Sequence, residues 1–408
     1  MGSLKVLAVV AAISSVSFAV NPISEAFDSL GLTSFASAAA ALNDSSEGQA
    51  LLSMVLSGGN YSILAPNNDA FSDASALTSD STLLLDTLAY HILRGSFSSS
   101  NSSSLNLTSA TSPNHTIGRS MLNDSTYVTL EGNASQVVAW TTENGAITFL
   151  NQPSNVSVVN STRINGTGLA VYVLSGILSI PPSMSLLLTN STNTTSIAGL
   201  LNSTMIPSAN GTNDTIGNIL DAQRGITLFA PSNSAFSAVS STLPVLEGNL
   251  TAFTTVLQNH IINGSTLYSS EIVNGSSMTS AAGEPLTFST NSSGTYVTSG
   301  STTAKIISTD MLCMNGVVHV IDNVFLNTDS DMSAASSAYN YATSEATKLV
   351  SETGVISATA TGASGSSTSS SSSSNGSKNG AAALSASAHY MTLLAAVVSF
   401  VVIGSVLA

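Results

Sequence analysis

Histidines and the lone cysteine are the side chains of this sequence best suited to metal or nucleophilic chemistry. The 408 residues include five histidines, which are so dispersed that no pair has the close spacing of a zinc site. The single cysteine, Cys313, lies among Met311, Leu312 and Met314, and this apolar setting favours a buried, unreactive thiol. The five histidines are His91, His115, His260, His319 and His389. We therefore expect no metal site and no bound cofactor.

The sequence also lacks the motifs that mark the common enzyme classes. It contains no G-x-S-x-G elbow, no H-E-x-x-H pair, no P-loop and no complete G-x-G-x-x-G. Paired carboxylates, as in enzymes that cleave polysaccharides, are the catalytic groups that such a chain could still carry. We predict that the protein is not an enzyme, and we retain glycan hydrolysis as the least favoured hypothesis.

The charge balance excludes nucleic acids as partners. The chain has 22 acidic and eight basic residues, for a net charge of −14, and the basic residues are spread singly. No basic stripe is therefore present to neutralise phosphates. Charged residues make up only 7% of the chain, against roughly 25% in an average soluble domain. The surface is expected to be wetted by hydroxyl groups, amides and attached sugars.

An internal repeat predicts the elements that position the candidate residues. Residues 61–71, YSILAPNNDAF, recur as residues 226–236, ITLFAPSNSAF. In both copies a short apolar strand ends at a proline, which cannot continue a ladder of backbone hydrogen bonds. Asn68 and Asn233 then stand where a helix N-cap is expected.

Two further landmarks follow in each copy. Apolar residues spaced four apart, starting at Leu84 and again at Phe253, predict an amphipathic helix. A later turn and strand appear at residues 168–175, GLAVYVLS, and at residues 315–322, NGVVHVID. In the first copy Tyr172 replaces the histidine of this strand.

These three landmarks, in the same order and twice over, resemble the defining segments of fasciclin-like domains. The resemblance covers roughly residues 21–328. It implies an α+β fold with two tandem domains, each a wedge-shaped β-sandwich with a helical layer. We place the first domain at residues 20–180 and the second at residues 183–328, with Pro181-Pro182 as a short, stiff junction.

The resemblance draws attention to one histidine in each copy. In animal fasciclin-like proteins a Tyr-His pair flanked by Leu or Ile is implicated in integrin binding, and Tyr90-His91 matches this pair. The second copy has Asn259-His260 at the same place. These four residues are the candidate adhesion motif. The other interpretation is that each histidine is buried at the end of its helix and makes hydrogen bonds there.

Both ends of the chain resemble processing signals. Residues 1–19 contain one lysine, an apolar run and small residues before a cleavage site, as in a secretory signal peptide. The apolar end of residues 381–408 has no basic residue after it, which is unlike a transmembrane helix. A triplet of small residues starting at Asn379 precedes it, and this layout predicts a GPI-attachment propeptide. Asn379 is the predicted attachment residue, and Asn375 or Gly376 also fits the spacing.

Residues 329–380 are predicted to form a disordered Ser/Thr-rich stalk. Residues 366–375 are almost entirely serine, and such a composition cannot bury enough apolar surface to offset the entropy of the chain. A weak helical periodicity over residues 331–352 is not sufficient to predict a helix.

The sequence contains about 20 Asn-x-Ser/Thr sequons, which together with a signal peptide predict an N-glycosylated surface. The candidate glycosylation sites are Asn43, Asn106, Asn123, Asn155, Asn202, Asn249, Asn274 and Asn291.

These features together predict a non-enzymatic adhesion glycoprotein, GPI-anchored in the outer leaflet of the plasma membrane, with transfer to the cell wall as an alternative location. The terminal signals and the low charge resemble those of fasciclin proteins of fungal walls. The expected partners are cell-surface or matrix glycoproteins or wall polysaccharide, with weak self-association as a further hypothesis. The alternative function is that of a structural wall glycoprotein, or one that binds wall glycan without specific adhesion.

Overall fold

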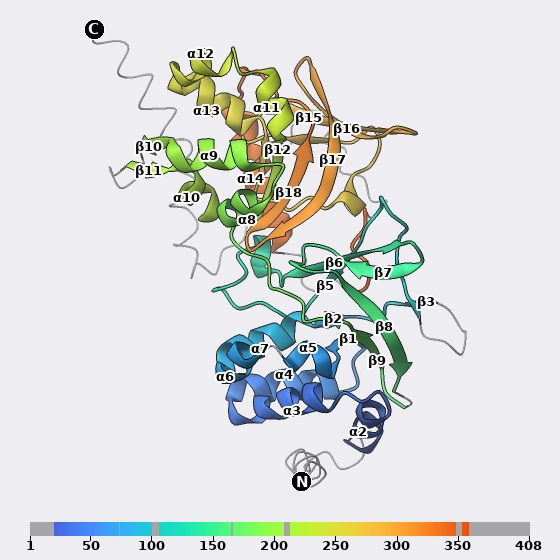
Figure 1. Ribbon diagram of the computed structural model, residues 1–408. Helices are drawn as coiled ribbons and strands as arrows, with labels where there is room; N and C mark the ends of the chain where they lie inside the picture. Colours follow the sequence, from blue (N-terminus) through green and yellow to red (C-terminus); the bar gives the residue numbers. More distant parts are fainter. Residues whose placement is uncertain are drawn as a thin grey trace, which may run out of the picture.

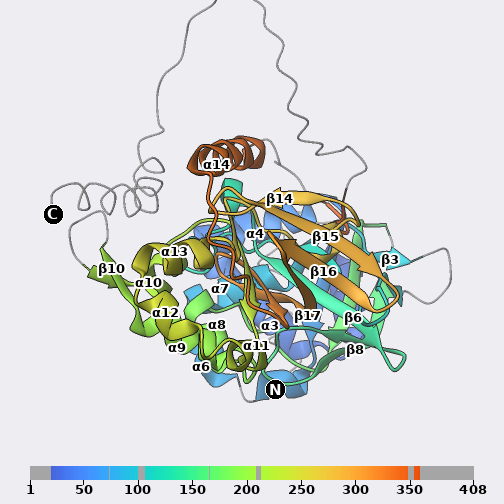
Figure 2. The ribbon, with the colours of Figure 1, turned by 90° about the horizontal axis from the view of Figure 1, so that it is seen from above.

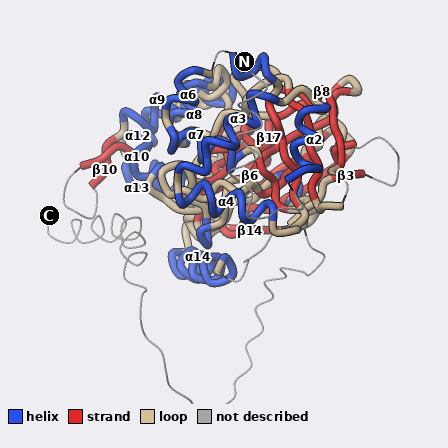
Figure 3. The backbone as a smooth tube through the Cα atoms, turned by 90° about the horizontal axis from the view of Figure 1, so that it is seen from below, coloured by secondary structure: helices blue, strands red, loops and turns tan. Residues whose placement is uncertain are grey.

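The computed structural model describes residues 20–72, 74–99, 106–164, 166–207, 213–347 and 353–358. Within these residues the chain forms two domains, each built around a seven-stranded sheet, and Figure 1 shows one domain above the other. Figure 3 shows most of the helices towards one side of the molecule and most of the strands towards the other.

The first domain starts with helices and then builds its sheet. Its helices are α2 (Val20–Ser29), α3 (Thr33–Ala41), η1 (Leu42–Asp44), α4 (Ser46–Leu56), α5 (Asn68–Ser72), α6 (Ser75–Ser79), α7 (Ser81–Tyr90) and η2 (Glu131–Asn133). Its strands are β1 (Tyr61–Pro66), β2 (Ile92–Arg94), β5 (Thr116–Arg119), β6 (Val137–Glu143), β7 (Ala146–Phe149), β8 (Val156–Arg163) and β9 (Leu169–Leu174), with a separate pair β3 (Ser98–Ser99) and β4 (Asn106–Leu107). The sheet order is β2-β1-β9-β8-β7-β6-β5.

The second domain repeats this arrangement. Its helices are α8 (Met184–Asn190), α9 (Thr195–Ser203), α10 (Ile216–Asp221), α11 (Asn233–Ala238), α12 (Leu243–Glu247), α13 (Leu250–Gln258) and η3 (Ser269–Glu271). Its strands are β12 (Ile226–Pro231), β13 (Ile261–Asn263), β14 (Ser277–Thr279), β15 (Pro285–Asn291), β16 (Gly294–Ser299), β17 (Thr302–Cys313) and β18 (Gly316–Ile321), with a separate pair β10 (Met205–Pro207) and β11 (Asn213–Thr215). The sheet order is β13-β12-β18-β17-β16-β15-β14, which matches that of the first domain strand for strand.

The long strands β8 and β17 give each sheet its wedge shape. In each domain the strand of the first landmark pairs in parallel with the strand of the last, as β1 with β9 and β12 with β18. β9 and β18 are buried at every residue, as expected for strands covered on both faces. The register of β8 and of β17 is interrupted by bulges, and a bulge bends a strand sharply. Each long strand can therefore belong to both halves of a folded sheet, and the predicted α+β wedge with a helical layer is confirmed.

The asparagines after the two prolines do not cap the helices that they were predicted to cap. Asn67 Oδ1 accepts the hydrogen bond of the first turn of α5, and Ser232 caps α11. Asn68 and Asn233 instead accept hydrogen bonds from backbone N–H groups in the first turn of α3 and of α9, at 2.9 and 2.8 Å. The predicted cap was therefore wrong by one residue. In both domains this asparagine joins two helices.

The C-terminal part of the described chain is more ordered than the sequence predicts. α14 (Met332–Ala346) starts at Asp331, whose carboxylate accepts hydrogen bonds from the backbone N–H groups of Ser333 and Ala334. Figures 2 and 3 show this helix on the outside of the molecule, near β14. The predicted start of the stalk at residue 329 is therefore too early, because the capping aspartate makes the weak periodicity sufficient for a helix.

The remaining terminal predictions fall outside the described residues. These are the signal peptide at residues 1–19, residues 359–380 of the stalk, and the propeptide at residues 381–408 with Asn379 before it. Among the helices of the described ranges, none has the length and apolar character needed to cross a bilayer.

Candidate functional site

The four residues of the candidate adhesion motif lie inside the two domains. Tyr90, His91, Asn259 and His260 are each at most 3% exposed. They lie where α7 and α13 end and the next strand begins. Buried side chains cannot touch a partner while the domains stay folded, so the adhesion role implied for them stays an untested prediction.

Each of the two histidines ties its helix to the chain that follows the last strand of its sheet. The Nε2 atom of His91 accepts a hydrogen bond from the backbone N–H of Leu178 at 2.9 Å, and its Nδ1 atom lies 2.7 Å from the carbonyl oxygen of Thr87. The same two bonds recur at His260, at 3.0 and 2.7 Å. A neutral imidazole donates at one nitrogen and accepts at the other, and burial lowers the pKa of both histidines to about 4. The geometry thus supports the structural interpretation of both histidines.

Their neighbours in the motif also serve the fold. The hydroxyl of Tyr90 donates to the carbonyl oxygen of Val137 at 3.1 Å. The side-chain amide of Asn259 donates to the carbonyl oxygens of Asn327 and Asp329, at 3.0 and 3.1 Å. Tyr90 and Asn259 are thus satisfied by different partners, which explains why the two copies tolerate different residues here.

A buried carboxylate marks the junction between the two domains. Asp310, on β17, is 0% exposed, and its Oδ2 atom lies 2.6 Å from Nδ1 of His115 in the first domain. The backbone N–H of Ser269 donates to Oδ1 at 2.7 Å, and the hydroxyl of the same serine donates to Oδ2. The side-chain amide of Asn151 donates to the backbone carbonyl of Asp310 at 2.7 Å. Both domains therefore supply the partners of this one residue.

A second histidine, His319 on β18, completes the surroundings of Asp310. Its Nδ1 atom accepts a hydrogen bond from the backbone N–H of Asp310 at 3.3 Å, and its Nε2 atom lies 2.8 Å from the carbonyl oxygen of Leu267. Burial alone would raise the pKa of the Asp310 carboxyl, but the hydrogen bonds of His115 and Ser269 and the nearby imidazoles outweigh it and lower the pKa. The carboxylate is thus held in its charged form.

The backbone of Asp310 is strained. Its φ angle is 57°, in the left-handed region that few residues other than glycine adopt. Such a conformation persists only where the surrounding contacts fix it. The hydrogen bonds just described supply those contacts from both domains.

The cluster of serine, histidine and aspartate does not have the arrangement of a hydrolase triad. Ser269 Oγ and His115 Nδ1 both bond to the same oxygen of Asp310. In a triad the serine bonds to the imidazole, which then accepts its proton. Here the carboxylate takes the hydroxyl hydrogen bond, so the serine is not activated. Among the described residues no group of histidine, cysteine and acidic side chains could hold a metal ion.

An apolar core lies beside this polar cluster and also draws on both domains. Its members are Ile117, Val137 and Ala139 from the first domain, Tyr268, Leu312 and Val317 from the second, and Ile356 from the C-terminal segment. Hydrogen bonds across the junction join Glu131 to Thr266, Arg224 to Leu130 and Asn133, and Gln136 to the backbone of Cys313. The two domains therefore meet through a continuous interface and not through a linker alone.

Comparison with known proteins identifies the repeated unit. The fasciclin domain model matches residues 33–181 and 200–327, which together make up most of the chain. The protein belongs to the fasciclin domain family. The fasciclin-like arabinogalactan protein of the fungus Arthroderma benhamiae is 28% identical over 284 residues, which cover 67% of this chain and 59% of that relative. A solved FAS1 domain pair from the insect cell adhesion molecule Fasciclin I is also similar, with 16% identity, a TM-score of 0.31, and coverage of 69% of this chain and 93% of that one.

The candidate glycosylation sites of the two fasciclin domains are mostly on the surface. Asn43 is half-buried and Asn106 lies in β4. The exposed sites are Asn123, Asn155, Asn202, Asn249, Asn274 and Asn291. Their accessibility is compatible with N-glycosylation, which stays a prediction for all eight.

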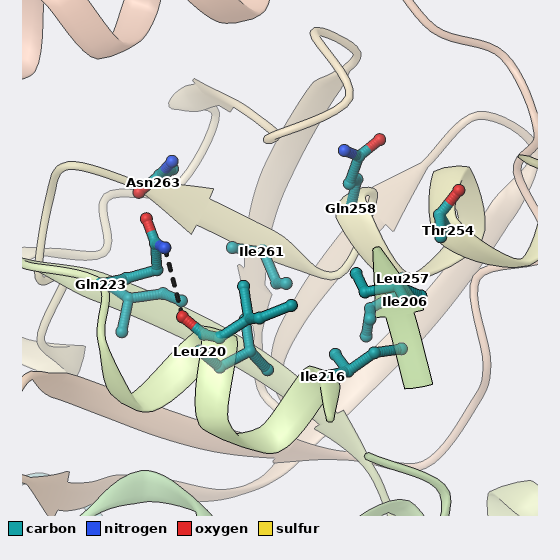
Figure 4. A pocket seen from close by; sticks show the side chains of 11 residues that line it. Ile206, Ile216, Leu220, Gln223, Thr254, Leu257, Gln258, Ile261 and Asn263 are labelled. Carbon is teal, nitrogen blue, oxygen red and sulfur yellow. Dashed lines mark hydrogen bonds between the residues drawn. The ribbon is translucent and has the colours of Figure 1, made fainter. Parts of the chain in front are cut away.

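The second fasciclin domain contains a small apolar pocket between α10, α13 and β13. Figure 4 shows its aliphatic side chains, with Gln223 and Asn263 at one end and Thr254 and Gln258 at the other. Its volume is about 40 Å³, well below the roughly 300 Å³ of the smallest usual ligand sites. This volume accommodates only a few water molecules, so the pocket is not a candidate site for substrate.

The interface between the fasciclin domains was not predicted from the sequence. Asp310 and His115 are 195 residues apart in the chain, and neither belongs to a local motif. An aspartate with a left-handed backbone has no sequence signature of its own. A single sequence therefore offers no signal that would have paired these residues.

Proposed function

We propose that this protein is a non-enzymatic adhesion glycoprotein of the cell surface, held at the outer face of the plasma membrane by a GPI lipid. The observation that carries the proposal is the interface between the two fasciclin domains. It holds them together as a single folded unit, which we call the head. Its partners would be glycoproteins of neighbouring cells or of the matrix, or wall polysaccharide. The name of the fungal relative supports a glycoprotein of this kind.

The burial and hydrogen bonding of the reactive side chains support a non-enzymatic role. His91, His260 and His319 are all buried and hydrogen-bonded within the fold. The carboxylate of Asp310 is engaged in hydrogen bonds at the domain junction. These groups stabilise the head. Contacts with a partner would therefore be made by its exposed surfaces and not by the buried Tyr-His position.

A structural glycoprotein of the wall is the second candidate function. The exposed sequons on both domains favour it, because a dense coat of sugar would cover much of the protein surface. In that case the bulk of the head would matter, and no single face would bind a ligand.

Genetic deletion separates the two functions. Cells that lack the gene should lose attachment to their neighbours or to the substratum if the protein is an adhesin, and the wild-type gene should restore it. A chain that ends before the predicted propeptide should be secreted and fail to restore attachment. Normal attachment of the deletion strain, together with altered wall composition, would contradict the adhesion proposal and favour the structural function.

A further inference from the structure

Residues 353–358 cross the junction between the two fasciclin domains as an extended strap. The backbone N–H groups of Gly354 and Ile356 donate to carbonyl oxygens of the first domain, at 3.0 and 2.9 Å. The backbone N–H of Ala358 donates to a carbonyl oxygen of η3 in the second domain at 3.2 Å. This short segment thus bonds to both domains.

The side chains of the strap alternate as in a half-buried strand. Ile356 is 6% exposed and inserts into the apolar core that the two domains share. Its neighbour Val355 is 44% exposed and forms an isolated antiparallel bridge with Gly118 on β5. One residue of the strap therefore provides most of its apolar contact.

A glycine in the first domain allows the strap to approach closely. A Cβ atom on Gly95 would lie 2.6 Å from the backbone nitrogen of Gly354, and its φ of +101° also disfavours any other residue. The backbone of the strap therefore packs directly against the backbone at Gly95.

The chain reaches the strap through α14, which has few buried contacts. Ala346 is the only residue of the helix that is buried, and the backbone N–H of Asp331 donates to the carbonyl oxygen of Ala282 at 2.8 Å before the helix starts. Residues 329–347 and 353–358 therefore lie on the two domains without belonging to either sheet.

We propose that residues 353–358 are a latch that holds the two domains in one orientation and is the first contact to release when the chain is pulled from its C-terminal side. Residues 359–408 follow the strap in the chain, so tension from that side reaches its hydrogen bonds and Ile356 before it reaches β18. β18 is buried between β12 and β17 and resists the load longer. The physiological setting of the latch rests on the proposed C-terminal anchoring, whereas its contacts do not.

Release of the latch should lengthen the chain by a defined amount. Once the latch opens, α14 can detach with it, because only one residue of the helix is buried. The freed residues 329–358 have an extended length of about 100 Å, and the chain gains this length less the distance that the folded segment already spans, while both sheets stay folded. The His115–Asp310 contact would remain and keep the domains close. Under load the head would therefore lengthen in a small first step before either domain unfolds.

The test holds the full chain by handles at its two ends in an optical trap. The wild-type chain should show a first gain in contour length of somewhat less than about 100 Å, at a lower force than domain unfolding. Ile356→Asp should abolish this step, and Val355→Asp, which changes the exposed neighbour in the same way, should retain it. A first step as long as a whole domain, or identical traces for the two variants, would overturn the proposal.

Hydrogen exchange measures the latch without tension and without any ligand. The amides of Gly354, Ile356 and Ala358 should exchange at least about tenfold faster in Ile356→Asp than in Val355→Asp, because the buried side chain holds them in place. Amides of β9 and β18 report whether both variants remain folded. Equal exchange of the strap amides in the two variants would overturn the latch, whereas loss of adhesion alone would leave it intact.

Discussion

The Nδ1 atom of His115 and the Oδ2 atom of Asp310 lie 2.6 Å apart although they belong to different fasciclin domains. The carboxylate is fully buried and accepts further hydrogen bonds from Ser269. A buried charge with this many partners is costly to leave unpaired. The contact therefore makes the orientation of the two domains part of the stability of the protein.

Asp310→Ala should destabilise the chain by about 3 kcal/mol, because the backbone N–H of Ser269 and the imidazole of His115 lose their acceptor. The loss should be visible as a lower midpoint of urea unfolding. Asp28→Ala removes an exposed carboxylate and serves as the matched control, with a change below about 0.5 kcal/mol. Equal midpoints for the two variants would show that the junction adds nothing to stability.

Acid should destabilise both domains through His91 and His260. Their pKa values in the folded protein are lowered to about 4 from 6.5, so the unfolded chain binds more protons between these two values. The free energy of unfolding is therefore highest above pH 6.5. It falls as the pH is lowered towards 4, by about 3 kcal/mol for each histidine. Unfolding free energies measured from pH 7.5 to pH 4 check this.

The variants His91→Gln and His260→Gln should flatten that dependence, each by a similar amount, since the two sites share the same geometry. Both variants should also be less stable at pH 7.5, because a glutamine does not reproduce the two ring bonds. A slope unchanged by either substitution would contradict the assignment of the acid sensitivity to these residues.

Asp86 should have the opposite pH dependence. Burial, with smaller contributions from Asp124 and Asp80, raises its pKa from 3.8 to about 6, and its Oδ2 atom has no hydrogen-bond partner. Stability from this group is greatest below pH 3.8 and is lost as the pH rises through 6. Asp86→Asn should therefore stabilise the protein at pH 7 and have little effect at pH 4. A variant that is less stable than wild type at pH 7 would contradict this.

Glycosylation should discriminate between exposed and enclosed sequons. Asn155 and Asn291 are exposed and should carry glycans. Asn263 also begins a sequon, but it is half-buried and its side-chain oxygen is enclosed at the small pocket of the second domain. Mass spectrometry of glycopeptides from the secreted protein should therefore find Asn263 unmodified, and high occupancy there would contradict the packing around β13.

The sequence predicted the repeated elements well because their signals are local. The strand that ends at Pro66 or Pro231 and the apolar spacing from Leu84 both depend on residues close in the chain. The helical cap was misplaced because Asn67, Asn68 and Ser232 all offer suitable oxygen atoms, and only the tertiary fold decides which helix each one meets.

The junction and the strap depend on contacts between distant parts of the chain. Ile356 lies in a segment whose composition indicates a stalk, and a single isoleucine gives no signal of the core that receives it. The Tyr90-His91 pair shows the opposite case, a site indicated by sequence that the structure does not expose. A family resemblance implied an adhesion role for the pair, but the fold buries both residues.

Binding of the purified, fluorescently labelled protein to intact cells tests the central claim of adhesion most directly. We predict saturable binding that unlabelled protein competes away. Tyr90→Phe, a change inside the core, should leave this binding intact. Exchange of the exposed loops of one domain should reduce it. Absence of saturable binding, with both domains shown to be folded by hydrogen exchange, would contradict the adhesion account.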